Sequence, residues 1–423
     1  MTDPIIYHVD VNSAFLSWEA KHRLDTGETL DLRTVPSVIG GSEKHRHGIV
    51  LAKSVPAKKY QIHTGEPLMR AREKCPGLLV IPPSYSLYVQ SSEKLLDKLR
   101  SYAPKVEPYS IDEAFCDMSG TTRLYGDPVD FAHRLKDEIR EELGFTVNIG
   151  VANNRLLAKM ASDFEKPDRV HTLFYDEIAK KMWPLDVSEL FFVGRSTTQK
   201  LYSMGIHTIG QLAKTSPDIL RARLKSHGET IWNYANGLDV SAVLDRNEPS
   251  KEYGNSITVP FDVTDADTAK NILLSLCETI GARIRADHVY IKRISVTIRD
   301  CEFKDCSHQE TLFSATDVTE KIFETACKLF DSLWNHTPIR LLGVQTFQVS
   351  DEEFTQYSLF DSAHYEQLKK MNHAVDEIRK KFGEDAIKRA CFLEETGGIR
   401  HMTGKMSRAK REASSHKSSD LLL

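Results

Sequence analysis

Three acidic residues have the type and spacing expected of a divalent-metal site. Asp10 follows the strand-like segment 5–9, and Asp112 and Glu113 stand where two short strand-like runs meet. Magnesium prefers hard carboxylate oxygens and leaves positions for water and phosphate oxygens. Phosphoryl transfer from a nucleoside triphosphate uses two such ions about 3.5–4 Å apart. The three carboxylates therefore predict a two-magnesium site for nucleotidyl transfer.

The local elements decide whether these carboxylates can meet. Neighbouring residues on a regular strand face opposite sides, so Asp112 and Glu113 can share a site only at a turn or a bulge. The two short runs between residues 106 and 118 predict a hairpin that supplies such a turn. Two simpler interpretations stay open. Asp10 could cap the helix that follows it, and Asp112 and Glu113 could form a solvated turn.

The composition indicates a cytoplasmic chain with several folding units. The 423 residues are 40% hydrophobic and 27% charged, and this length suggests roughly two to four units. No stretch approaches the roughly 18 consecutive apolar residues of a membrane span, and the N-terminus lacks a signal-peptide pattern. Seven cysteines without a C-x-x-C pair indicate buried thiols and neither a disulfide framework nor a zinc site.

The net charge of −4 argues against a nucleic-acid-binding protein, since such proteins usually carry a basic domain. The charge is unevenly distributed, however. Residues 351–353 are all acidic, whereas the segment beyond residue 395 has an excess of lysine and arginine. A charge run of this kind is also typical of a solvated segment, and we expect residues 396–423 to be a disordered basic tail.

The apolar patterns divide the chain into units. The expected units are an α/β unit over residues 1–166 with a small mixed insertion at about 26–77, a helical unit over 167–240, a polar linker over 241–250, an α+β unit over 251–350 and further helices within 351–395. In the first unit, a strand ends at Val11 and leads into a helix capped by Asn12 and Ser13. The expected elements of the α+β unit are strand 256–261, helix 266–286, strands 291–298 and 309–313, helix 318–334 and strand 341–349.

Residues 10–15 and 109–117 resemble the two carboxylate motifs of Y-family DNA polymerases, and the resemblance extends over about the first 390 residues. It implies a multidomain α/β and α+β fold with the right-hand architecture. The α/β unit would be a palm with inserted small fingers, followed by a helical thumb and an α+β little finger. The resemblance also implies that Asp10, the Val11 carbonyl, Asp112 and Glu113 hold two magnesium ions.

The same resemblance assigns residues to the incoming nucleotide. Phe15 falls at the steric gate, where an aromatic ring excludes a ribose 2′-hydroxyl, and Lys159 matches a lysine that contacts the triphosphate. The fingers motif departs from the family pattern, because Val55 replaces the usual tyrosine and Lys58 replaces the usual arginine. Lys58 therefore offers a point charge in place of a two-pronged phosphate contact. Phe15 as a core aromatic and Lys159 as a solvent-facing lysine are the alternatives.

Two segments are candidates for DNA contacts. Gly194 and Gly205 lie in a sequence that resembles a helix-hairpin-helix, where backbone N–H groups approach a phosphate. The alternative is that they are ordinary helix C-cap glycines. In the part that resembles the little finger, Lys292 and Arg293 place cations on a strand, where a sheet could face DNA phosphates.

Residues 356–360 resemble the peptide by which bacterial polymerases bind the sliding clamp. Gln356, Leu359 and Phe360 match its pattern, and the two apolar side chains would fill a pocket on the clamp. The pattern is short, and Leu359 and Phe360 covering a core is the alternative.

The sequence therefore predicts a template-directed DNA polymerase of low fidelity that lacks proofreading and bypasses damaged template bases. We expect primer-template DNA, dNTPs and the sliding clamp as partners, and a monomeric chain. A metal-dependent nuclease and a non-catalytic accessory protein of the same fold are the rival interpretations. The motifs leave open whether the chain is of the DinB or the UmuC type.

Overall fold

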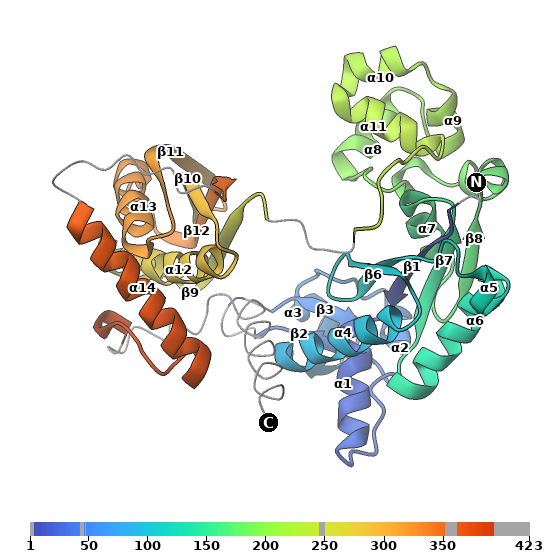
Figure 1. Cartoon of the computed structure of the whole chain (residues 1–423), viewed down its shortest axis with the longest axis horizontal. Coiled ribbons are helices and arrows are strands. Elements are labelled where there is room, and N and C mark those ends of the chain that lie inside the picture. Colours follow the sequence, from blue (N-terminus) through green and yellow to red (C-terminus); the bar gives the residue numbers. More distant parts are fainter. Residues whose placement is uncertain (1–3, 43–45, 47, 245–249, 352–361, 393–423) are drawn as a thin grey trace.

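The computed structural model describes residues 4–42, 46, 48–244, 250–351 and 362–392. The described elements include three sheets of five, four and three strands. In Figure 1 the five-stranded sheet carries the N-terminal strand at its centre, and the four-stranded sheet belongs to the C-terminal part of the chain. We name the four units palm, fingers, thumb and little finger.

The palm sheet has the strand order β5-β6-β1-β7-β8. Its strands are β1 (Ile6–Val11), β5 (Lys105–Pro108), β6 (Glu113–Asp117), β7 (Val147–Ala152) and β8 (Val170–Leu173). The palm helices are α1 (Ala14–Asp25), α4 (Tyr85–Arg100), α5 (Thr122–Tyr125), α6 (Pro128–Glu138), η2 (Ile139–Leu143) and α7 (Arg155–Ser162). The strand β8 pairs in parallel with β7 and therefore belongs to the palm sheet. The predicted end of the palm at residue 166 is wrong, because the palm extends further by this one strand. This edge strand is only partly buried, so its apolar pattern is weak.

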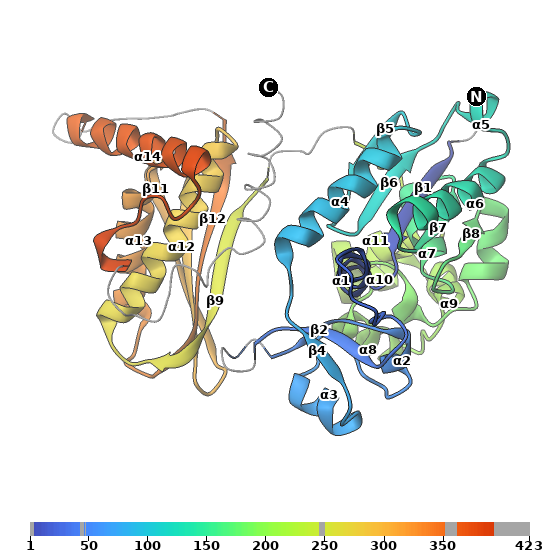
Figure 2. The same ribbon diagram turned by 90° about the horizontal axis from the view of Figure 1, so that it is seen from below.

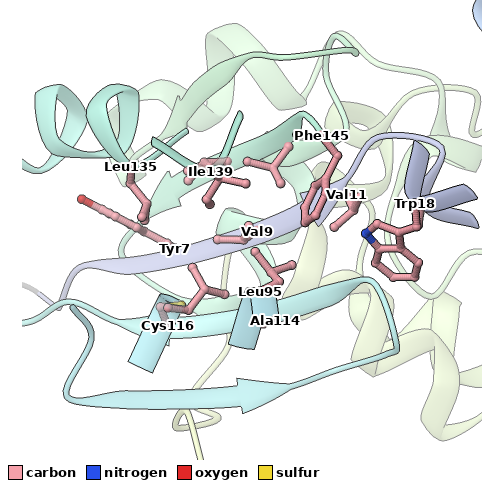
Figure 3. Packing of buried hydrophobic residues seen from close by; sticks show 14 of the residues in the cluster. Tyr7, Val9, Val11, Trp18, Leu95, Ala114, Cys116, Leu135, Ile139 and Phe145 are labelled. Atoms are coloured by element: carbon pink, nitrogen blue, oxygen red, sulfur yellow. The ribbon is translucent and has the colours of Figure 1, made fainter. Parts of the chain in front are cut away.

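The central strand β1 is buried along its whole length and separates two packed layers. Successive side chains of a strand point to opposite faces. Tyr7, Val9 and Val11 accordingly point into the core that contains Leu95 and Leu135 (Figure 3). The even-numbered residues face α7, as the hydrogen-bonding contact of 2.7 Å between the His8 ring and Ser162 shows. Asp10 therefore belongs to the face that α7 covers.

Gly150 lets α7 lie close to the palm sheet. A Cβ atom at this position of β7 would stand 1.9 Å from the Ala158 carbonyl oxygen, which belongs to the backbone of α7. We expect Gly150→Ala to lower the free energy of unfolding by about 1–3 kcal/mol or more, because overpacking must push the helix away. Urea unfolding followed by circular dichroism measures this change. Gly77→Ala is the control, since nothing lies within 4 Å of its added Cβ, and equal midpoints for the two variants would contradict the expectation.

The fingers form a small sheet with a core of their own. Their elements are β2 (Ser37–Gly40), β3 (Val50–Lys53), α2 (Val55–Lys58), α3 (Leu68–Lys74) and β4 (Leu79–Ile81). The strand β4 pairs in parallel with β2. The insertion therefore continues past the predicted boundary at residue 77.

The thumb is helical, as predicted. Its elements, with the turns that lead into it, are η3 (Tyr175–Glu177), η4 (Ile178–Met182), η5 (Val187–Glu189), α8 (Arg195–Ser203), α9 (Ile209–Lys214), α10 (Pro217–Leu224) and α11 (Ser226–Ala235). The chain after α11 returns to the palm, where the Asn154 amide donates to the Gly237 carbonyl oxygen at 2.8 Å and the Leu244 N–H donates to the Glu107 carboxylate at 2.8 Å. The first part of the predicted linker 241–250 is therefore fixed on the palm.

The little finger is a four-stranded sheet of order β11-β10-β12-β9 with α12 and α13 side by side on one face (Figure 2). Its elements are β9 (Tyr253–Val263), α12 (Ala266–Ala286), β10 (Tyr290–Asp300), β11 (Asp305–Thr316), α13 (Thr319–Leu333), β12 (Ile339–Ser350), α14 (Ser362–Phe382) and η6 (Ala390–Phe392). Ion pairs join α14 to this unit, among them Arg285 with Asp376 at 2.5 Å and Arg379 with Glu278 at 3.4 Å. The predicted end at residue 350 is therefore too early.

Two further predictions concern the burial of the cysteines and the presence of membrane-spanning segments. Cys75, Cys116 and Cys277 are buried, Cys327 and Cys391 are partly buried, and Cys301 and Cys306 are exposed at the hairpin between β10 and β11. The prediction of buried thiols is therefore correct for the first three only. No helix among the described residues is long and apolar enough to span a membrane.

Candidate functional site

The predicted acidic residues lie at one end of the palm sheet. Asp10, near the end of β1, is the register partner of Glu113, the first residue of β6. The Val11 N–H donates to the Asp112 carbonyl oxygen at 3.0 Å. The predicted hairpin is present, with Asp112 in its turn. Residues more than 100 positions apart in the sequence are thus brought to the same end of the sheet.

Each of these carboxylates has a partner from the protein. Lys166 donates to Asp10 at 2.7 Å, Lys159 donates to Glu113 at 2.9 Å, and the Ser110 hydroxyl donates to Asp112 at 2.7 Å. Within the described residues, no three His, Cys, Asp or Glu side chains are grouped closely enough to hold one metal ion. In this arrangement each acid is bound to a group of the protein and not to a shared ion. The shared metal site therefore stays a prediction.

The electrostatics of Asp10 suit a cation. Burial raises the pKa of the Asp10 carboxyl to about 6; Lys166 opposes this shift, and the nearby negative charge of Glu113 adds to it. A raised pKa means that the ionised carboxylate is not fully stabilised by its surroundings. A further positive charge beside it, such as a metal ion, would stabilise the ionised form. The oxygen-only donor set of Asp10, Asp112 and Glu113 is the set that magnesium prefers. These residues fit a divalent ion.

Lys166 is a site residue that the sequence did not reveal. It lies in the loop after α7, and its ammonium also contacts Asp163 at 2.7 Å. A lone lysine between Glu165 and Pro167 carries no periodic or motif signal, so only the fold brings it to Asp10. The side chain of Lys166 is 30% exposed, whereas that of Lys159 is 11% exposed.

The start of α1 differs from the prediction that Asn12 and Ser13 cap it. Ser13 precedes the helix in a left-handed conformation with φ of 50° and makes no side-chain cap hydrogen bond. The Asn12 side chain donates to Asn148 at 3.1 Å and accepts from the Asp168 N–H at 2.8 Å. Asn12 therefore ties β1 to β7 and to the loop that follows α7, and this tie rather than a cap positions the site.

The two remaining nucleotide-site residues lie on different units. Phe15, in the first turn of α1, stacks on Tyr88 with ring centroids 4.4 Å apart and lies edge-on to Tyr85. Phe15 is half-buried, so it packs on the core without being enclosed by it. Lys58 is exposed at the end of α2 in the fingers, and Val55 at the start of that helix is 49% exposed.

The thumb contains the predicted helix-hairpin-helix arrangement. Gly194 is the N-cap of α8, and Gly205, with φ of 78°, lies in the turn between α8 and α9. The N–H groups of this turn bond within the protein, because that of Gly205 donates to the Tyr202 carbonyl and that of His207 to Gln211. The prediction that this turn offers N–H groups is therefore wrong for Gly205. The first N–H groups of a helix have no intrahelical acceptor, so the start of α8 after Gly194 is the better donor.

On β10, Lys292 and Arg293 lie between the buried residues Ile291 and Ile294 and are both only partly buried. The pairing of β10 with β11 shifts register at this point, and the extra residues of the irregularity belong to β11. Neither cation is therefore enclosed in the core. Arg293 donates to the Thr311 hydroxyl of β11 at 3.2 Å.

The predicted clamp peptide with Gln356, Leu359 and Phe360 lies outside the described residues, as does the basic tail.

Comparison with known proteins gives consistent similarities. Residues 9–163 match the impB/mucB/samB family, residues 250–359 match the C-terminal domain of that family, and residues 189–239 match the DNA polymerase iota thumb domain. The chain is 48% identical to DNA polymerase IV of Clostridium acetobutylicum, over 92% of this chain and 98% of that protein. It is 36% identical to DNA polymerase IV of Acetivibrio thermocellus, over 93% and 98%. It shares its fold with a solved Y-family DNA polymerase chimera of Dbh and Dpo4, at a TM-score of 0.70 and 20% identity, over 82% of this chain and 100% of the chimera.

Proposed function

The chain belongs to the Y-family of DNA polymerases, the impB/mucB/samB family, and from this premise we propose which of its residues carry out DNA synthesis. It is a DNA-directed DNA polymerase of the DinB type that performs template-directed translesion synthesis. The fold class predicted from the sequence is confirmed. The comparisons support neither the nuclease nor the accessory-protein alternative.

We propose that Asp10, the Val11 carbonyl, Asp112 and Glu113 bind two magnesium ions. Y-family polymerases generally depend on divalent metals, and bound ions of this kind activate a hydroxyl and neutralise a triphosphate. The observation that carries this proposal is the pairing of Asp10 with Glu113 at the end of the sheet. When the carboxylates serve as ligands, Lys159 loses Glu113 as its partner, and Lys166 loses Asp10 but keeps Asp163. Both ammonium groups can then stabilise the triphosphate. The side chain of Lys166 is more exposed than that of Lys159, so its ammonium group can reach the triphosphate more easily.

The remaining contacts complete the proposal. Phe15 excludes the ribose 2′-hydroxyl, and Lys58 adds positive charge from the fingers. The start of α8 at Gly194, and Lys292 with Arg293 on β10 of the little finger, contact DNA phosphates without reading sequence. We also propose that this synthesis is of low fidelity and proceeds without proofreading.

Incubation with a primed template tests the proposed function directly. In the presence of magnesium and dNTPs we expect the primer to be extended by template-directed addition and not shortened. Primer degradation without extension would support a metal-dependent nuclease. Size-exclusion chromatography with light scattering tests the proposed monomeric state.

The clamp peptide gives a separable prediction. Replacing both Leu359 and Phe360 by alanine should weaken binding to a bacterial sliding clamp about tenfold or more, because anchor side chains of this kind each contribute more than about 1 kcal/mol. Fluorescence anisotropy with labelled clamp measures the affinity. Extension by single nucleotides without the clamp should stay at the wild-type rate, and clamp binding equal to that of the wild type would show that the two residues cover a core instead.

A further inference from the structure

The ammonium group of Lys159 lies between two aromatic rings from different units. Its nitrogen is 5.0 Å from the centre of the Tyr109 ring and 5.5 Å from the centre of the Phe191 ring. Both distances are within the range of about 6 Å at which a cation is attracted to a ring face. Tyr109 stands in the turn between β5 and β6, and Phe191 precedes α8 of the thumb. The third neighbour is the Glu113 carboxylate at 2.9 Å.

This arrangement matters because Lys159 is buried. The whole residue is 9% exposed, and a buried ammonium is costly unless charges or polar groups compensate it. In the present structure Glu113 supplies that compensation. Once Glu113 serves as a metal ligand, its negative charge is shared with the ion. The two ring faces are then the protein groups that still favour a cation at this place.

The thumb holds one of these rings in place. Phe191 stacks on Tyr234 of α11 at a centroid distance of 6.3 Å and touches Phe192 at 4.8 Å. The Phe191 N–H donates to the Met160 sulfur of α7 at 3.4 Å. The Phe191 ring is thus packed in the thumb, while its backbone N–H contacts the residue that follows Lys159 in the palm helix. Phe191 therefore links the thumb to the part of α7 that carries Lys159.

We propose that Tyr109 and Phe191 form an aromatic clamp that positions the Lys159 ammonium at the polymerase centre, so that the reaction depends on the placement of the thumb. The inference rests on the proposed function, since it takes Glu113 as a metal ligand. Tyr109 and Phe191 are positioning residues in this account. Neither ring carries a charge that could pair with the acidic residues.

Chemical modification of Lys159 tests the clamp without any polymerase activity. The full chain carrying Glu113→Gln removes the carboxylate partner, and reductive methylation followed by mass spectrometry reports how fast Lys159 reacts relative to the exposed Lys59. We expect Lys159 to remain protected in this background. Adding Phe191→Leu, which keeps an apolar side chain without a ring face, should raise its rate about fivefold.

Two matched variants separate the ring from mere bulk. Phe191→Tyr retains a ring face and should keep Lys159 protected. Phe192→Leu removes a neighbouring ring that packs on Phe191 and Tyr234 at 4.8 and 5.7 Å, and it should leave the rate unchanged. An unchanged rate in Phe191→Leu, or an equal rise in Phe191→Tyr, would overturn the proposal. If Phe191→Leu does not fold, Tyr109→Leu with Tyr109→Phe as its rescue gives the same comparison.

Kinetics in the chain with Glu113 intact give the second readout. Phe191→Leu should lower kcat/KM for single-nucleotide insertion about five- to tenfold, with the Kd for primer-template within about twofold of wild type. Phe191→Tyr should restore the rate. A loss confined to DNA affinity would instead make Phe191 an ordinary thumb residue. If the wild-type chain extended no primer, the proposed function would fail. The methylation result would still decide whether Tyr109 and Phe191 hold the Lys159 ammonium.

Discussion

Primer extension should fall by about a thousandfold or more when Asp112 and Glu113 are both replaced by alanine. Bound metal ions stabilise transition-state charge by several kcal/mol, and each loss of about 1.4 kcal/mol slows a reaction tenfold. These two residues supply most of the carboxylate oxygens of the proposed site. Single-turnover extension of a labelled primer measures the loss. Binding of primer-template should persist, since the variant removes negative charge and leaves the thumb and little finger unchanged.

The control for this prediction removes the same charge elsewhere. Asp130→Ala with Glu141→Ala takes two exposed carboxylates from α6 and η2, and we expect extension at the wild-type rate. Because alanine at position 113 leaves Lys159 buried without its carboxylate partner, Glu113→Gln is the milder companion variant. Extension within tenfold of wild type in the double alanine variant would show that the acids do not hold the metals.

The site's framework could be predicted where the local pattern was strong. A continuous apolar run identified β1, and a helix was predicted over residues 266–286, which are the bounds of α12 in the structure. Two short strand-like runs that meet near Asp112 indicated the hairpin. In each of these cases the signal lies in neighbouring residues, because strand and helix periods are local properties of the chain.

The remaining parts depend on contacts between distant residues. The edge strands β4 and β8 are short and incompletely buried, so pairing with β2 and β7 rather than their own sequence makes them strands. Lys166 reaches Asp10 only because α7 packs on β1 and β7. Tertiary placement of this kind leaves little trace in a single sequence. The prediction that Asn12 caps α1 failed for the same reason, because the distant Asn148 competes for its side chain.

Ribonucleotide discrimination should collapse when Phe15 is made smaller. A 2′-hydroxyl forced against the ring would create a clash comparable with core overpacking, which costs about 1–3 kcal/mol, so Phe15→Leu and Phe15→Ala should reduce the preference for dNTP over rNTP by about 5- to 150-fold. The ratio of kcat/KM for dCTP and CTP opposite template guanine measures it. Selectivity should fall because rNTP insertion rises, with dNTP insertion affected less.

Phe15 packs in an aromatic cluster, so its replacement needs a control variant that disturbs the same cluster. Phe15 stacks on Tyr88 and meets Tyr85 edge-on at 6.5 Å, so truncation also loosens this aromatic cluster. Tyr85→Leu disturbs the same cluster and leaves the Phe15 ring in place, and it should lower stability without changing sugar selectivity. Equal loss of selectivity in both variants would mean that cluster packing sets the discrimination. Unchanged selectivity in Phe15→Ala would leave Phe15 as a core aromatic only, since the gate requires the ring itself to meet the sugar.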